Sequence, residues 1–285
     1  MLAVLCAAGL AACSDDATTV DAGDDATTTT TVAGTSTTGV PVPAGLVLRI
    51  TTGGGFLPAE LSFATVAPFT LYHDGRVVVP GPATLEYPGE ALPNLLTGTV
   101  GRDDVRDAVE AARDAGVADA ADLGRPPVAD APTTSFVLVD GGTTFRAEAY
   151  ALDLDEGPGL SAGQRDGRRR LRGLVAGMER LGAAATAPYR AGTVSVLVRP
   201  YDDVDRGSPP AEPAPGEADW PLGDLAAGGR EQFGGRCLGF TGADAERVLG
   251  AAAEARSNTR WRSGGTAWAL TFRPELPGDP PCPAR

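Results

Sequence analysis

The sequence contains no lysine, a single histidine and few sulfur-containing residues. All 24 basic residues are arginine, beside 1 His, 4 Cys and 2 Met in 285 residues. The lack of lysine excludes a Walker A phosphate loop and any lysine nucleophile. One histidine excludes an HExxH motif and a metal site built from several histidines. No other enzyme motif is found, so the sequence predicts no catalytic, cofactor-binding or metal-binding residue and no cofactor.

Positive charge is also scarce. The sequence has 24 arginines and 37 acidic residues, which gives a formal net charge of -13. Neutralising phosphates needs clustered positive charge, so a nucleic-acid partner is not expected. No run of about 18 apolar residues occurs, so no membrane-spanning helix is expected in the mature protein. The 38 Gly and 24 Pro indicate a folded body with many loops.

The first residues form a short apolar segment that ends at a cysteine. Residues 1–12 carry no charged side chain, and residues 10–13 read Leu-Ala-Ala-Cys. The segment is too short to span a membrane and is typical of a secretory signal peptide. The tetrad resembles the bacterial lipobox, which implies that Cys13 is diacylated and becomes the new amino terminus. The alternative is an ordinary signal cleaved after Ala12, and Cys6 is a poorer lipid site because a bulky residue precedes it.

The apolar segment lacks the basic residues with which signal peptides begin, because it follows Met1 directly. We therefore expect an upstream start codon that adds Lys or Arg. An intact-mass measurement showing translation from Met1 would contradict this expectation.

Residues 13–44 are predicted to be the lipidated cysteine and a disordered tether. Residues 14–44 are mainly Thr, Ala, Asp, Gly and Ser, a composition that cannot offset the entropy cost of ordering by burial. A flexible chain of this length reaches about 30 Å on average. Its five Asp and lack of basic residues disfavour contact with anionic lipid. The run Thr27–Thr31 could carry O-linked sugar, although a plain solvated linker is the simpler interpretation.

Residues 45–155 are expected to form a β-rich unit with one helix. Alternating apolar residues predict a strand over 46–51. Two glycine turns, Asp74-Gly75 and Asp140-Gly141-Gly142, predict two hairpins. Apolar residues at helical spacing predict a helix over 102–115.

Two features of this unit suggest chemistry, but each has a simpler interpretation. The triple glycine at 53–55 follows a strand, as a phosphate loop would, yet GxGxxG is incomplete and no helix is expected after Pro58. We interpret it as a bend or bulge. His73 lies at a hairpin end with no serine elbow or cysteine partner in the sequence, and we interpret it as a surface residue.

Residues 156–285 are expected to form a helix followed by a second α+β unit. A helix begins with a capping box of Ser161 and Gln164 and ends near Gly182. The remaining expected elements are strands over 193–199, 236–240 and 266–272, a proline-rich insertion over 208–215, and a helix over 242–256 capped by Thr241.

Cys237 and Cys282 remain as a pair in an oxidising compartment, and we expect them to form a disulfide. Closing a loop of about 46 residues would stabilise the fold by about 4 kcal/mol in the chain-entropy model. The bridge would also hold the proline-rich tail, residues 273–285, against the sheet.

An arginine cluster crowds the first half of the long helix. It comprises Arg165, Arg168, Arg169, Arg170 and Arg172. Positive charge near a helix amino terminus opposes the helix dipole, so anions are expected nearby. The cluster could bind an anionic partner or pair with the protein's own carboxylates, and we favour the second interpretation.

Two acidic clusters, residues 153–156 and 201–205, lack the spacing of an EF-hand loop. We therefore interpret both clusters as solvated loop acids, and calcium binding is the alternative. A hydrolase that uses carboxylates such as Asp74, Asp130 or Asp153 is a second alternative, and it requires two acids that face each other in a cleft.

Several short segments together resemble a family of actinobacterial lipoproteins. They are the lipobox, the Thr-rich tether, Gly53–Phe56, Phe69–Gly75, Asp130–Thr134 and Arg273–Pro277 before Cys282. The resemblance covers most of the chain. That family has no established activity, so the resemblance implies no catalytic residues.

The sequence predicts an α+β fold of antiparallel β-hairpins and sheet packed with about three helices, in one or two β-rich units. We expect a lipid-anchored protein at the outer face of the plasma membrane that acts as a binding or scaffold module rather than an enzyme. Its expected partners are the membrane, through the lipid anchor, and an envelope protein or cell-wall ligand. A carboxylate-dependent envelope hydrolase and a calcium-dependent binding module remain the alternatives.

Overall fold

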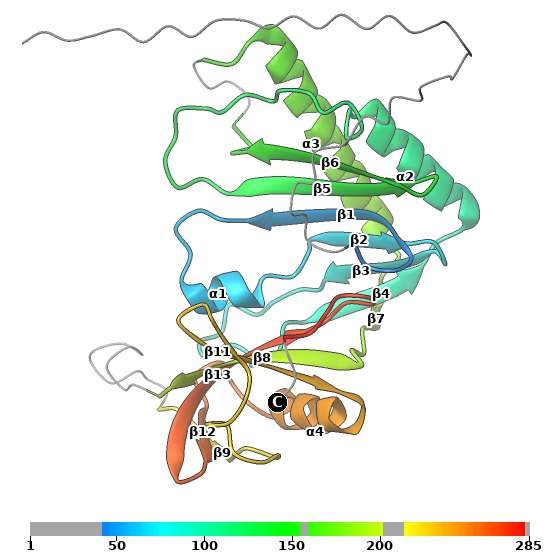
Figure 1. Cartoon of the computed structure of the whole chain (residues 1–285). Coiled ribbons are helices and arrows are strands. Elements are labelled where there is room, and N and C mark those ends of the chain that lie inside the picture. Colours follow the sequence, from blue (N-terminus) through cyan, green and yellow to red (C-terminus); the bar gives the residue numbers. More distant parts are fainter. Residues whose placement is uncertain (1–41, 155–158, 202–213, 283–285) are drawn as a thin grey trace, which may run out of the picture. The chain divides into compact units, whose positions relative to one another are not determined.

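The computed structural model describes residues 42–154, 159–201 and 214–282. The chain divides into two units, and the larger, Pro41–Arg285, contains all of the described residues. Their main elements are two largely antiparallel sheets, of seven and six strands, and four helices (Figure 1). The predicted α+β class is confirmed, and the strands belong to two sheets rather than one.

The first sheet has the strand order β6-β5-β1-β2-β3-β4-β7, and all of its neighbouring strands are antiparallel. Its strands are β1 (Leu46–Gly53), β2 (Phe69–Tyr72), β3 (Arg76–Pro80), β4 (Leu95–Thr99), β5 (Thr133–Asp140), β6 (Thr143–Tyr150) and β7 (Ala187–Pro188). Both predicted hairpins are confirmed. Gly75 in the first turn has φ 80°, and Gly141 and Gly142 in the second have φ 55° and 80°. Glycine adopts such values without the steric cost that a Cβ imposes, so these residues fix the turns.

Helices α2 (Arg102–Asp114) and α3 (Ala162–Gly182) pack on this first sheet (Figure 1). Leu171, Leu174 and Met178 of α3 are buried in the same core as strand residues such as Phe69 and Leu71. The sequence analysis placed this helix in a unit beginning at residue 156. Its apolar stripe is instead buried against the first sheet, so the boundary between the two cores follows α3.

The second sheet has the order β10-β11-β8-β13-β12-β9, with β12 and β9 parallel and the other neighbours antiparallel. Its strands are β8 (Thr193–Pro200), β9 (Glu217–Asp219), β10 (Arg230–Gln232), β11 (Gly235–Thr241), β12 (Arg260–Ser263) and β13 (Thr266–Pro274). Helix α4 (Gly242–Ala253) packs with it around buried aromatic rings. Trp261 lies at the centre of these rings, 6.0 Å from Trp220 and 5.5 Å from Phe272 between ring centroids.

A fourth, short helix, α1 (Ala59–Ala64), lies against β13 of the second sheet. Its Phe63 is fully buried in a small cluster with Leu197, Cys237 and Cys282. Alternate residues of β8 point to opposite faces, so Val196 packs with α4 while Leu197 packs with α1. The second sheet is therefore covered on both faces.

Of the three helix ends predicted from capping residues, one is confirmed and two differ from the structure. The Ser161 capping box forms, since Ser161 Oγ accepts from Gln164 N at 3.2 Å and Gln164 Oε1 accepts from Ser161 N at 2.8 Å. Gly182, however, is the last residue of α3 rather than its cap, and it lies against Val79 and Phe69. Thr241 stands at the cap position of α4, but its side chain makes no capping hydrogen bond.

The sequence analysis missed the short elements α1, β4, β7, β9, β10 and β12. Helix α1 begins directly after Pro58, where no helix was expected, and it has only six residues. The triple glycine still makes the predicted bend, because β1 ends at Gly53 and Gly54 and Gly55 have φ values of 79° and 77°.

The carboxy-terminal segment joins the second sheet to the first. The residues after β13 accept two hydrogen bonds from tyrosines. Tyr189 donates to the carbonyl of Glu275 at 2.9 Å, and Tyr72 donates to the carbonyl of Pro277 at 3.2 Å. Arg49 on β1 forms a 2.7 Å ion pair with Asp279. These contacts attach a tail with little regular structure to β1, β2 and the residue after β7.

Alkaline pH is expected to weaken this attachment through Tyr189. Burial disfavours its phenolate and raises the pKa of Tyr189 to about 12. A pKa above that of the unfolded chain gives stability that is complete below pH about 10 and is lost as the pH rises through about 12. We expect the free energy of unfolding to fall by about 1 kcal/mol over that range through this group, allowing for its partial exposure. Denaturant titrations at several pH values check this, and Tyr189→Phe should flatten the alkaline limb; an unchanged slope would contradict the assignment.

Candidate functional site

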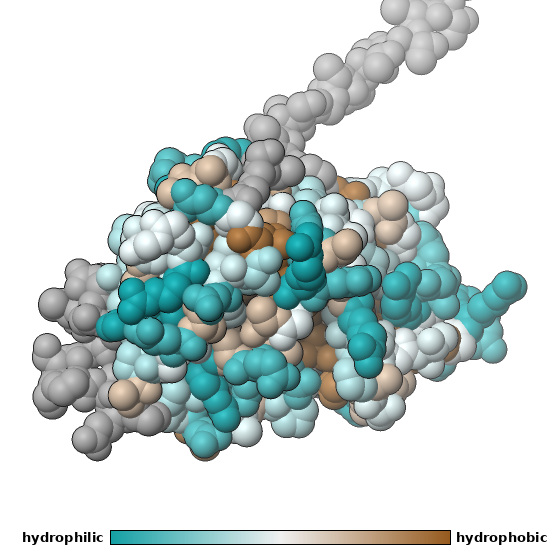
Figure 2. All heavy atoms as spheres, turned by 90° about the horizontal axis from the view of Figure 1, so that it is seen from below, coloured by the Kyte–Doolittle hydropathy of each residue, from teal (hydrophilic) through white to brown (hydrophobic). Residues whose placement is uncertain are grey.

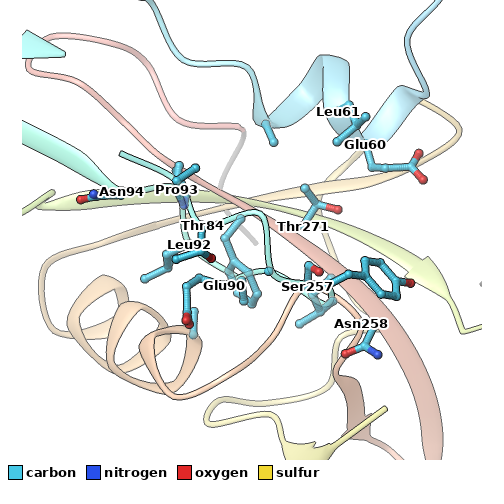
Figure 3. A pocket seen from close by; sticks show the side chains of 18 of the residues that line it. Glu60, Leu61, Thr84, Glu90, Leu92, Pro93, Asn94, Ser257, Asn258 and Thr271 are labelled. Carbon is cyan, nitrogen blue, oxygen red and sulfur yellow. The ribbon is translucent and has the colours of Figure 1, made fainter. Parts of the chain in front are cut away.

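A groove of about 880 Å³ lies beside the second sheet. It is bounded by α1, by the segment 82–94 between β3 and β4, by the end of α4 with the loop after it, and by β13. Figure 3 shows α1 on one side, and segment 82–94 and α4 on the other. These elements are far apart in sequence, so only the folded chain brings them together.

The groove lining is mainly aliphatic and proline-rich, with neutral polar groups and two carboxylates among them. Its polar side chains are Glu60, Thr84, Tyr87, Glu90, Asn94, Ser257, Asn258 and Thr271. No arginine is among the lining residues. The groove thus combines apolar surface with a few hydrogen-bonding groups, which is the usual composition of a ligand site.

The two groove carboxylates belong to separate ion pairs. Glu60 on α1 pairs with Arg199 at 3.1 Å, and Glu90 pairs with Arg256 at 2.6 Å. Figure 3 shows Glu60 and Glu90 on opposite sides of the groove, pointing away from each other. They therefore do not form the facing acid pair that glycoside hydrolysis needs.

Asn258 adds a hydrogen-bond donor at the groove wall. The residue is only 4% exposed, and its Nδ2 atom has no hydrogen-bond partner in the described part of the chain. A buried donor without an acceptor costs about 1 to 3 kcal/mol.

Large exposed apolar side chains gather in the two segments that border the groove. Among the described residues these exposed side chains are Phe56, Leu57, Leu61, Leu85, Tyr87, Val128, Leu154 and Phe233, and the first five belong to segments 56–61 and 85–87. Phe56 is 91% exposed and Leu85 is fully exposed. The face seen in Figure 2, by contrast, is mostly hydrophilic or of intermediate hydropathy, with small apolar areas. Concentrated apolar exposure of this kind marks interaction sites.

The acids proposed for a hydrolase do not line this groove. Asp74, Asp130 and Asp153 are all exposed and lie in three different loops. A hydrogen bond from the Arg76 backbone N–H lowers the pKa of Asp74, which favours its ionised form, whereas a general acid must keep its proton near neutral pH. His73 is exposed at the end of β2, as expected.

The two acidic clusters lie only partly within the described residues. In the described ranges, no three His, Cys, Asp or Glu residues are grouped so that they could hold a metal ion. Of the two acidic clusters, residues 155–156 and 202–205 lie outside those ranges, and Asp153 is exposed.

The arginine cluster divides into two groups. Asp166, within the cluster, forms ion pairs with Arg169 and Arg170, which agrees with the interpretation that the cluster pairs with the protein's own carboxylates. Arg168 behaves differently: it is fully buried and donates to backbone carbonyls, among them that of Tyr150 at 3.0 Å. Arg165 likewise donates to the carbonyl of Leu160.

Of the cysteines singled out in the sequence, Cys237 and Cys282 form the predicted disulfide, with Cα atoms 5.7 Å apart. Cys13 lies outside the described residues, as does almost all of the predicted tether. In the part of the chain that the structure describes, no helix is long and apolar enough to cross a membrane.

The groove was missed by the sequence analysis because its walls are assembled from distant segments. One signal was available: segment 82–94 contains three prolines and, among its polar residues, Leu85 and Tyr87, which no helical or alternating pattern would bury. No protein-family model matches the chain, and no curated protein matches it in sequence.

Proposed function

We propose that the protein is a lipid-anchored binding module at the outer face of the plasma membrane, and that the groove beside the second sheet is its binding site. The anchor is the lipid on Cys13, and the tether that follows holds the folded body away from the bilayer. The resemblance to actinobacterial lipoproteins supports this location.

The observation that carries the binding role is the exposed apolar border of the groove. Leu61 and Tyr87 line the groove and are 54% and 59% exposed, although burying a large apolar side chain stabilises a fold by about 1.5 to 3 kcal/mol. A ligand that covers these side chains would recover that free energy on binding.

The same geometry disfavours the hydrolase alternative. The groove carboxylates lie apart and are paired with arginines, and Asp74, Asp130 and Asp153 are exposed outside it. Hydrolysis by two carboxylates needs a desolvated acid close to a second one. Binding without covalent chemistry therefore accounts better for this arrangement.

The anchor is tested by replacing Cys13 in the chain expressed from its native locus. We expect the unchanged protein to carry a diacylglycerol-modified Cys13 by mass spectrometry and to partition into detergent, and we expect Cys13→Ser to be released into the medium. Cys6→Ser is the matched control and should remain anchored. Cleavage after Ala12 with an unmodified Cys13 would contradict lipid anchoring.

The binding role is tested separately by hydrogen exchange of the full chain with solubilised cell-envelope material. Protection of residues 59–64 and 82–94, and not of the distant β5–β6 hairpin, is the expected result. Equal exchange in both segments with and without the material would contradict binding at the groove.

A further inference from the structure

We propose that the occupant of the groove is a short extended segment of a partner protein, rich in apolar side chains and free of acidic ones. This inference rests on the proposed binding function and names the chemical class of the partner. The groove's polar groups disfavour a lipid chain, its aliphatic walls disfavour a glycan, and its charge disfavours an acidic segment.

The polar groups in the groove disfavour a lipid acyl chain. Thr84 and Thr271 place hydroxyl groups among the apolar lining residues. An acyl chain offers no hydrogen-bonding atom, so it would desolvate these groups without compensation, and each such group costs about 1 to 3 kcal/mol. A peptide backbone supplies a carbonyl and an amide at nearly every residue.

The walls disfavour a glycan. A sugar ring binds best with its C–H face on a flat aromatic ring, and the aromatic lining residues are Tyr87 and Phe272. Phe272 is 1% exposed, so Tyr87 offers the accessible ring among the lining residues. The remaining apolar lining is leucine, alanine and proline, which suits branched aliphatic side chains and proline.

The two groove carboxylates disfavour an acidic segment. Glu60 and Glu90 line the groove and no arginine does, in a chain of net charge -13. A carboxylate entering the groove would meet like charges, and such juxtaposition suppresses unsuitable partners. Arg199 and Arg256 are already paired with the two groove acids, so a neutral segment fits without a new ion pair.

The exposed border supplies the anchor points for such a segment. Leu61 projects from α1, while Leu85 and Tyr87 project from the opposite segment, 82–94. Extended peptides are recognised through pockets for a few apolar side chains, with backbone hydrogen bonds between them. In the groove, Leu61 and Tyr87 supply exposed apolar surface, and Thr84 and Thr271 supply side-chain hydroxyl groups that can hydrogen-bond to a peptide backbone.

The test compares four probes with the full chain anchored in phosphatidylcholine vesicles, read by hydrogen exchange of residues 59–64 and 82–94. The probes are a pool of short blocked peptides of Leu, Pro, Ala, Val and Gln, the same pool with two Gln replaced by Glu, a tetrasaccharide of N-acetylglucosamine, and phosphatidylglycerol vesicles. We expect the neutral peptides to protect both segments and the acidic peptides to bind at least about tenfold more weakly.

Two exposed leucines make a matched pair of variants. Leu61→Asp puts a charge into the groove at the first turn of α1, where an acidic residue suits the helix, and should weaken binding of the neutral peptides by about tenfold or more. Leu154→Asp changes a leucine of similar exposure outside the groove and should leave binding unchanged. Equal effects of both variants would overturn the inference.

The remaining outcomes separate this inference from the function on which it rests. Protection by the tetrasaccharide or the vesicles, without protection by the peptides, would overturn the peptide inference and leave the groove as a binding site. Protection that rises with protein concentration in the absence of any probe, together with dimer formation, would identify a second copy of the chain as the occupant. No protection by any probe would overturn the peptide inference, and the binding function would be overturned as well if the cell-envelope material also left both segments unprotected.

Discussion

Replacing both Cys237 and Cys282 with alanine is expected to lower the free energy of unfolding by about 4 kcal/mol. The two residues are 45 positions apart, so the disulfide closes a long loop and restricts the unfolded chain. Both cysteines are buried, against Phe63 of α1 and Leu197 of β8. The substitution therefore also leaves a small cavity where the sulfur atoms packed, which adds to the loss.

The disulfide acts together with a close backbone contact. Cys282 N donates to Ser195 Oγ at 2.9 Å, and a Cβ on Gly239 would collide with the carbonyl oxygen of Cys282. Ser195 also donates to the buried carboxylate of Glu275. The end of the tail is thus held by one covalent bond and by hydrogen bonds that require it to lie directly on β11 and β8.

Denaturant unfolding of the double variant, followed by circular dichroism, measures the effect. The control is the unchanged chain unfolded in the presence of a reductant. Its free energy of unfolding should match that of the variant within about 1 kcal/mol, because only the variant lacks the sulfur atoms and contains the cavity. The contacts of Pro277 and Asp279 with the first sheet do not involve the disulfide, so hydrogen exchange should increase at the amide of residue 282 and remain slow at Asp279, whose N–H donates to the carbonyl of Leu276 at 3.0 Å. A loss below about 1 kcal/mol would show that the tail is held without the disulfide.

The sequence allowed correct prediction of features that depend on neighbouring residues. Both hairpins followed from glycine turns, and α2 and α3 from apolar spacing and a capping box. The disulfide followed from elimination, because only two cysteines lie beyond the predicted signal and lipid site. In each case a few adjacent residues, or a count, contain the information.

Features that depend on tertiary packing were missed for a physical reason. Strand β7 has two residues and β9 has three, too few to show an alternating pattern, and each is fixed only by its neighbour in the sheet. The groove is formed by α1, segment 82–94 and β13, which lie up to about two hundred residues apart. Its exposed leucines are ordinary hydrophobic residues until the fold shows that nothing covers them.

Arginine 168 is the position where substitution is expected to be most damaging in the first sheet's core. Arg168→Met should lower the free energy of unfolding by about 3 to 5 kcal/mol. The side chain is fully buried, and its guanidinium donates to the carbonyls of Tyr150, Ala151 and Leu154 at the end of β6 and to Leu123. Methionine fills the space but offers no donor, so four carbonyl oxygens in buried or part-buried positions would each lose a hydrogen bond.

Arg169→Met is the matched control, because it changes the next residue of the same helix. The Arg169 side chain is 66% exposed and its ion pair is with Asp166, so its removal should cost no more than about 0.5 kcal/mol. Arg168→Lys should fall between the two, since one ammonium group cannot reach carbonyls that a planar guanidinium spans. Denaturant titration of the three variants measures these losses in the free energy of unfolding. Equal losses at positions 168 and 169 would mean that the buried hydrogen bonds of Arg168 contribute no more than an exposed ion pair. The expected difference would show that Arg168 attaches α3 to the turn after β6, while Arg169 only neutralises charge.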